Sequence, residues 1–171
     1  MRRRTGLTLI EVILALLVLG LLAALTIPRL SRAAGLPDNS ALLRAHLRVL
    51  RCAIDRYYQD HGAYPGSTED GRHAAGTPEA FVAQLTEFTD RAGRVSLVRD
   101  DVHCFGPYLR DGVPGNPLLP GWPAGVFMQS GAGCLTPVEE DGIGWVYSFE
   151  TGQIIANLSG QDALGRAYVG Y

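Results

Sequence analysis

Lysine is absent from this chain, in which all 15 basic residues are arginine. We interpret this absence as a bias of genomic composition and attach no function to it. An excess of positive charge is absent as well, since the formal net charge is −2 at pH 7. Proteins that bind nucleic acid through its phosphates carry a basic patch or stripe, so the composition predicts no nucleic-acid partner.

Motifs that carry enzymatic chemistry are also missing. The chain contains no Gly-x-Ser-x-Gly sequence, no phosphate-binding loop, no His-Glu-x-x-His pair and no paired Cys and His spacing typical of zinc sites. The sequence therefore predicts that the protein is not an enzyme, and it indicates no certain cofactor. Beyond its N-terminal segment the chain is long enough for one soluble domain with a single core.

Cysteines are few, and they stand at Cys52, Cys104 and Cys134. If the domain is exported, we expect a disulfide between Cys104 and Cys134, because both lie in the loop-rich half of the sequence. Spacing alone does not determine the pairing, so the other combinations stay open.

What the chain does have is a long apolar run near its N-terminus. Glu11 is the one ionisable side chain between Leu7 and Ile27, and arginines occupy positions 2 to 4. A helix of this length spans roughly the 30 Å hydrocarbon core of a bilayer. Because positive flanks resist translocation, we expect the N-terminus to stay in the cytoplasm and the remaining residues to be exported.

Glu11 is the informative residue of this run. A carboxylate inside an apolar helix costs about 3 kcal/mol at the bilayer centre and less near an end, so Glu11 needs a partner. Cleavage between Gly6 and Leu7 would create a cationic amine four residues before it. In a bundle of parallel helices, the amine of one subunit could neutralise Glu11 of its neighbour and set the axial stagger between them.

The N-terminal segment resembles the prepilin cleavage and methylation motif of type IV pilins and type II secretion pseudopilins, through the sequence GLTLIE at residues 6–11. The resemblance implies that a prepilin peptidase removes residues 1–6 and methylates the new amine of Leu7. Gly20 and Pro28 stand where pilins commonly carry a helix-loosening glycine and proline. Leu7 itself departs from the motif, in which phenylalanine is usual.

A second segment, YYQDHGAYP at residues 57–65, resembles the close of the long helix in major pseudopilins. The implied fold is α+β, with a long N-terminal helix packed on a small antiparallel sheet. We expect a leader at residues 1–6 and a transmembrane and filament-core helix at 7–28. The amphipathic second half of the helix should occupy residues 29–62, and a globular periplasmic domain residues 63–171.

The resemblance implies a structural subunit of a type II secretion pseudopilus that supports protein export. Its partners would be the prepilin peptidase, further copies of the subunit, an inner-membrane platform protein, a secretion ATPase and the lipid bilayer. The chain would cross the inner membrane once, with its N-terminus in the cytoplasm and its C-terminal domain in the periplasm. After assembly it would form a periplasmic filament.

Other interpretations of the same residues stay open. The chain could be a surface type IV pilin for adhesion, motility or DNA uptake, or an anchored binding module that uses the region of Trp122 and Trp145 and never polymerises. The apolar run could belong to a plain anchor, or to a secretory signal peptide cleaved after residues 31–33. Its length and Glu11 argue against these last two interpretations.

Periodicity predicts the elements of the exported part. Apolar residues spaced three and four apart predict a helix from Asn39 or Ser40 to about Asp60, with arginines 44, 48 and 51 off the apolar stripe. Thr77 should cap a short helix whose buried stripe is Phe81, Leu85 and Phe88. Short strands are expected near residues 95–97 and 126–128. Alternation predicts a hairpin of residues 145–149 and 153–157 whose aromatic face packs on the long helix.

Only the resemblance implies a calcium site, because major pseudopilins often bind calcium in a loop near the C-terminus. The family's acidic loop is not clearly reproduced in this sequence. Asp162 is the single residue that we select as a calcium ligand. Hard oxygen ligands of the kind calcium prefers are present at Glu139, Glu140, Asp141, Asn157 and Asp162.

Overall fold

The computed structural model describes residues 12–15, 39–162 and 164–171. The chain divides into two compact units, Met1–Asp38 and Asn39–Tyr171. Residues 12–15 of the first unit are helical. Among the described residues, no helix is both long enough and apolar enough to cross a membrane. The residues predicted to direct processing and assembly lie outside the described residues: Gly6, Leu7, Glu11, Gly20 and Pro28.

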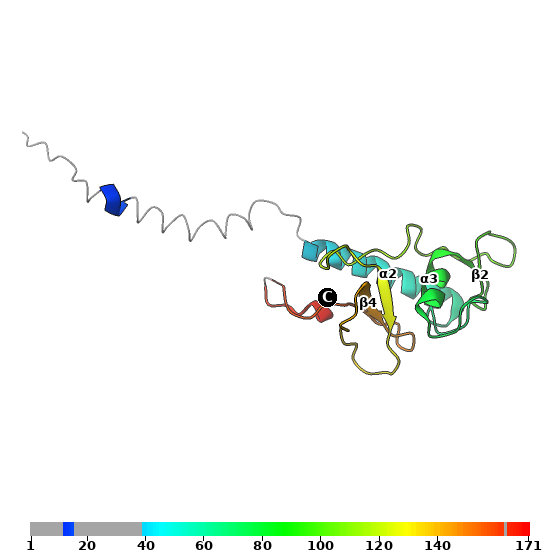
Figure 1. Ribbon diagram of the computed structural model, residues 1–171. Helices are drawn as coiled ribbons and strands as arrows, with labels where there is room; N and C mark the ends of the chain where they lie inside the picture. The colour runs from blue at the N-terminus through cyan, green and yellow to red at the C-terminus, as the bar shows by residue number, and fades with distance from the viewer. Residues whose placement is uncertain (1–11, 16–38, 163) are drawn as a thin grey trace, which may run out of the picture. The chain divides into compact units, whose positions relative to one another are not determined.

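Helix α2 (Asn39–His61) is the longest element of the second unit (Figure 1). A helix was predicted here from Asn39 or Ser40 to about Asp60, and one side of α2 is buried from Leu43 to Tyr57. Gly62 ends the helix as expected, with a left-handed φ of 71° and an N–H that donates to the carbonyl of Tyr58 at 2.8 Å. The predicted apolar stripe is confirmed by the buried residues Leu43, Leu47, Leu50, Ile54 and Tyr57.

A sheet of three strands in the order β3-β4-β5 packs against this stripe. Its strands are β3 (Gly125–Met128), β4 (Ile143–Tyr147) and β5 (Ile154–Ala156). Strands β4 and β5 form the predicted antiparallel hairpin. Trp145 and Tyr147 are fully buried in the same core as the α2 stripe, while Val146 belongs to a second cluster on the other face. The expected packing of the aromatic face on the helix is therefore confirmed.

The expectation of a wholly antiparallel sheet is wrong, because β3 runs parallel to β4. A parallel pair needs a crossover connection of about a dozen residues or more, and the long loop at residues 129–142 provides one. Alternating apolar residues show which side of a strand is buried, but they contain no signal for its direction. The strand near residue 126 was thus predictable and its orientation was not.

A short helix and a two-stranded sheet complete the domain beyond the C-terminal part of α2. Helix α3 (Pro78–Thr86) begins after the predicted cap, where Thr77 Oγ1 accepts from the N–H of Ala80 at 3.3 Å. Phe81 and Leu85 are buried. Phe88, which we expected on the same stripe, lies instead in β1 (Phe88–Thr89), which pairs antiparallel with β2 (Val95–Ser96). The helix ends earlier than expected because the backbone at Glu87 is extended.

Polar and aromatic side chains hold the C-terminal end of α2. His61 Nε2 lies 3.2 Å from Tyr108 Oη and 3.1 Å from Thr89 Oγ1, and Tyr108 donates to Asp60 Oδ2 at 2.8 Å. The ring of His61 lies 4.1 Å from that of Tyr57. Burial among these groups lowers the pKa of His61 from its ordinary value of 6.5.

Removal of a buried leucine from the stripe should destabilise the domain strongly. Leu50→Ala should lower the free energy of unfolding by about 2 to 5 kcal/mol, because the truncated side chain leaves a cavity. The matched control is Val49→Ala at the preceding residue, whose side chain is 50 % exposed, and it should change that free energy by less than about 0.5 kcal/mol. Urea unfolding of the purified chain in detergent, followed by tryptophan fluorescence, measures both. Equal losses would contradict the observed orientation of α2.

The lowered pKa of His61 should make stability depend on pH. As the pH falls below about 6.5, the unfolded chain protonates this imidazole while the folded ring stays neutral to lower pH. The unfolded state then binds more protons, so the free energy of unfolding should decrease from pH 7 towards pH 5. His61→Gln should flatten this slope. Unfolding measured at half-unit pH steps tests this, and an unchanged slope in the variant would refute the assignment. The pKa values of Asp70 and Asp90 are lowered from 3.8, so these residues should change the free energy of unfolding only at more acidic pH.

Candidate functional site

One flank of α2 carries three arginines on successive turns. Arg44, Arg48 and Arg51 are spaced four and three residues apart, so they lie on the same side of the helix. Together with Tyr171 they line a cavity of about 230 Å³. We call this surface the arginine flank. Three guanidinium groups line this cavity, so the surface carries positive charge.

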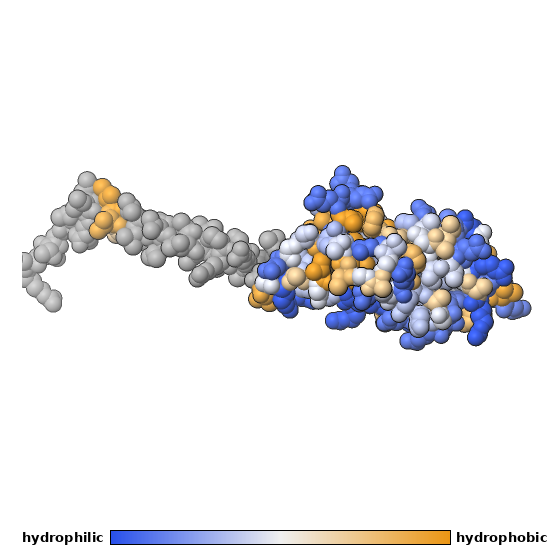
Figure 2. All heavy atoms as spheres, turned by 90° about the horizontal axis from the view of Figure 1, so that it is seen from below, coloured by the Kyte–Doolittle hydropathy of each residue, from blue (hydrophilic) through white to orange (hydrophobic). Residues whose placement is uncertain are grey.

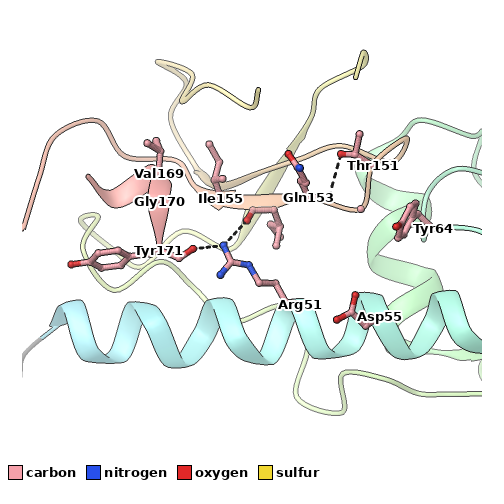
Figure 3. Close-up of a pocket in the computed structure, with 11 residues that line it drawn as sticks. Arg51, Asp55, Tyr64, Thr151, Gln153, Ile155, Val169, Gly170 and Tyr171 are labelled. Carbon is pink, nitrogen blue, oxygen red and sulfur yellow. Dashed lines mark hydrogen bonds between the residues drawn. The ribbon is translucent and has the colours of Figure 1, made fainter. Parts of the chain in front are cut away.

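Arg51 joins the flank to two distant parts of the chain (Figure 3). Its Nη2 donates to the carbonyl of Ile154 in β5 at 3.1 Å, and also to the main-chain oxygen of Tyr171. Tyr171 follows the 3₁₀-helix η1 (Tyr168–Gly170). Burial lowers the pKa of Arg51. This one guanidinium therefore connects α2, the sheet and the C-terminal segment.

A larger cavity of about 400 Å³ lies between α2, β5 and η1 (Figure 3). Arg51 and Asp55 both line it, and they stand one helical turn apart with opposite charges. Tyr64 and Thr151 line it as well. The lining residues include side chains that can donate and accept hydrogen bonds, and also the apolar side chains of Ile155 and Val169.

Asp162, which we selected as a calcium ligand, holds the C-terminal segment together. Its carboxylate accepts from the hydroxyl of Tyr171 at 2.5 Å, from Nε of Arg166 at 2.8 Å and from the N–H of Leu164 at 2.7 Å. These hydrogen bonds, that of Tyr171 first, hold the pKa of Asp162 well below its ordinary range. In the described part of the chain, no three His, Cys, Asp or Glu side chains gather to hold a metal ion. Calcium at Asp162 stays a prediction.

The other acidic candidates lie together on a different loop. Glu139, Glu140 and Asp141 are exposed and line a cavity of about 410 Å³. We call these three residues the acidic loop. Asn157 is buried beside it, where its Oδ1 accepts from the N–H of Val138 at 2.7 Å and its Nδ2 donates to the carbonyl of Ile143 at 3.0 Å. Asn157 thus clamps both ends of the acidic loop.

The disulfide expected between Cys104 and Cys134 is not present in the structure. Both cysteines, like Cys52, are free and exposed. Cys104 precedes Phe105, whose main chain pairs with Thr89 of β1. The carbonyl of Cys134 instead accepts from the side chain of Gln129 at 3.5 Å, just after β3. A disulfide between Cys104 and Cys134 stays a prediction.

Apolar residues form patches among hydrophilic ones on the face of the domain shown in Figure 2. Trp122 is half exposed, whereas Trp145 is fully buried, so the two tryptophans proposed for an anchored binding module do not share one surface. In the first unit, Val12, Ile13 and Leu14 are exposed. The exposed large apolar side chains of the second unit are Val49, Tyr58, Leu97, Val98, Val102, Trp122, Leu164 and Val169.

Sequence reasoning placed the three arginines off the buried stripe but missed their contact with Tyr171. The two residues joined by the hydrogen bond from Arg51 to Tyr171 are 120 positions apart. Nothing local in the sequence indicates such a contact, although three arginines on one side of a helix already indicated a charged surface.

Comparison with known proteins identifies a known motif at the N-terminus. Residues 1–27 match the family model described as the prokaryotic N-terminal methylation motif. The chain is 37 % identical over 76 residues to the type II secretion system core protein G of Pseudomonas aeruginosa, a match that covers 43 % of this chain and 50 % of the relative. It is 35 % identical over 74 residues to the protein of that name from Klebsiella pneumoniae, covering 43 % and 51 %. The protein of that name from Aeromonas hydrophila is 36 % identical over 73 residues, covering 43 % and 50 %. No solved structure gives a significant match.

The chain spans about half the length of the curated relatives it matches. The match to the methylation motif nevertheless includes residues 6–11, from which the sequence predicted a prepilin-type N-terminus. The predicted resemblance of this chain to the pseudopilins of type II secretion is therefore confirmed.

Proposed function

We propose that this chain is a structural subunit of a type II secretion pseudopilus, which is processed at its N-terminus and assembles through its N-terminal helix to support protein export. The observation that carries the proposal is the presence, in one chain, of the N-terminal methylation motif and of similarity to core protein G from three bacteria. The motif alone also fits a surface type IV pilin, and the relatives favour the secretion system.

Processing would act on the bond between Gly6 and Leu7. The prepilin peptidase would remove residues 1–6 and methylate the amine of Leu7. That amine would pair with Glu11 of the neighbouring subunit, so that neither charge stays alone among apolar helices. Gly20 and Pro28 would loosen the helix, because glycine lacks a side chain and proline lacks a backbone donor.

Before assembly, residues 7–28 would anchor the chain in the inner membrane, with the N-terminus in the cytoplasm and the unit Asn39–Tyr171 in the periplasm. The filament would form as apolar helices exchange contacts with lipid for contacts with one another. The exposed apolar side chains of residues 12–14 suit such an exchange. Further partners would be an inner-membrane platform protein and a secretion ATPase.

Mass spectrometry of the chain from membranes tests the processing step. In cells with an active prepilin peptidase, the mature chain should begin at Leu7 and carry one methyl group on its amine. In cells without the enzyme it should keep residues 1–6. A chain that keeps these residues in the presence of the enzyme, or that begins near Ala34, would overturn the proposal.

Replacing the charged residue of the motif tests assembly separately. Glu11→Ala should leave cleavage after Gly6 intact and reduce filament yield by at least about tenfold, because the amine of each neighbour loses its partner in an apolar bundle. Thr8→Ala is the matched control in the same segment and should assemble normally. Filaments sheared from cells and counted by electron microscopy give the yield. A normal yield of filaments from the Glu11 variant would contradict the proposed pairing of Glu11 with the amine of the neighbouring subunit.

A further inference from the structure

Two exposed apolar side chains lie at the end of the domain where α2 begins. Trp122 is 51 % exposed and Leu164 is 76 % exposed. We propose that these two side chains contact the lipid surface of the membrane while the subunit is anchored there and before it assembles. The inference rests on the proposed function, because the anchor at residues 7–28 is what brings the domain to the bilayer.

The loop that carries Trp122, at residues 115–123, is attached to the N-terminal part of α2. Asn39 Nδ2 donates to the carbonyl of Pro117 at 3.2 Å, and His46 Nδ1 lies 2.8 Å from the carbonyl oxygen of Gly115. The rings of His46 and Trp122 pack edge to face with their centres 6.4 Å apart. Trp122 is therefore fixed beside the beginning of the helix.

The backbone of this loop holds Trp122 in a strained conformation. Its φ of 52° lies in the left-handed region, which bulky side chains rarely adopt. Buried Asn116 closes the loop, because its N–H donates to the carbonyl of Pro123 at 2.9 Å and its Nδ2 donates to the carbonyl of Gly144 at 3.0 Å. Strain of this kind gathers at functional sites. Here it presents an indole to the outside of the domain.

Leu164 is attached to the same end of α2 through Tyr171. The N–H groups of Leu164 and Gly165 donate to Asp162, which also accepts from the hydroxyl of Tyr171. The ring centre of Tyr171 lies 5.0 Å from the guanidinium of Arg44 in α2. Figure 1 shows this C-terminal segment beside the beginning of the helix. The two exposed apolar side chains thus belong to the same end of the domain.

The length of the linker decides which end of the domain stays near the bilayer. Residues 29–38 separate the predicted membrane segment from Asn39, and a fully extended chain of that length spans at most about 36 Å. His61, at the other end of α2, lies about 33 Å farther along the helix, because each helical residue adds about 1.5 Å. The covalent connection therefore keeps the end with Trp122 closer to the membrane.

Lipid is the partner whose chemistry fits a tryptophan at this end. Tryptophan is enriched where membranes meet water, because its ring is largely apolar and its N–H is polar. Attraction to anionic headgroups is not the cause, since the acidic loop shares a cavity with Leu119, Pro120 and Pro123 of the Trp122 loop. The contact depends on burial of apolar surface, so it should persist at high salt.

Quenching of tryptophan fluorescence tests the contact in the full-length chain. The chain has two tryptophans, and Trp145 is fully buried, so Trp122 reports on lipid. The chain is reconstituted in phosphatidylcholine vesicles with and without bromine on the acyl chains close to the glycerol. Bromine should lower the emission to that of Trp122→Phe, in which Trp145 alone emits, and the loss should persist at high salt. The emission of Trp122→Phe itself should not change.

Tryptophans introduced elsewhere distinguish the two ends of the domain. In the Trp122→Phe chain, Leu164→Trp should again be quenched by bromine. Leu97→Trp is the matched control, because Leu97 is also 76 % exposed and follows β2, whose partner β1 lies beside His61 at the other end of α2. This variant should not be quenched. Both leucines are exposed, so thermal unfolding of the two variants should match that of the parent chain.

Flotation of the vesicles reports the anchor separately, so the outcomes can be told apart. A chain that floats and is quenched at positions 122 and 164, but not at 97, supports the contact. A chain that floats but is unquenched at either of the first two positions, or is equally quenched at 97, overturns the contact and leaves the proposed function in place. A chain that does not float has no anchor, which overturns the proposed function and the contact together.

Discussion

The domain depends on burial of the apolar stripe of α2 against the aromatic face of β4. Helices in proteins are stabilised mainly by packing of an amphipathic face, and only weakly by intrinsic propensity. Trp145 and Tyr147 supply the surface against which this face packs. Their polar atoms are also satisfied, since Trp145 Nε1 donates to the carbonyl of Pro114 at 2.7 Å and the hydroxyl of Tyr147 donates to that of Pro65 at 3.0 Å. The same two side chains therefore build the core and anchor the loops around it.

Burial of the stripe also decides what the other sides of α2 do. Once the stripe faces the sheet, the arginines must lie on one flank and Asn39 and His46 on the other. The first flank holds the C-terminal segment through Arg51, and the second holds the segment at residues 115–123. The positions of these charged and polar side chains thus follow from the orientation of α2 about its own axis.

The functional assignment has a different physical basis from the fold. Processing and assembly motifs act as short stretches of sequence, so GLTLIE and the apolar run after it could be interpreted without a structure. The structure adds the charged surfaces of the globular domain, which no short motif encodes. Similarity to core protein G connects the two, although it covers about half of each relative.

The sequence by itself determined the elements whose signals are local. Periods of three and four residues placed α2 and its buried stripe, Thr77 placed the start of α3, and alternation placed the β4–β5 hairpin, because each signal arises between near neighbours in the chain. Only the tertiary structure decided the parallel pairing of β3, the transfer of Phe88 from helix to strand and the hydrogen bond from Arg51 to Tyr171. These features join residues that are far apart in sequence, and they depend on which loops the packed core brings together.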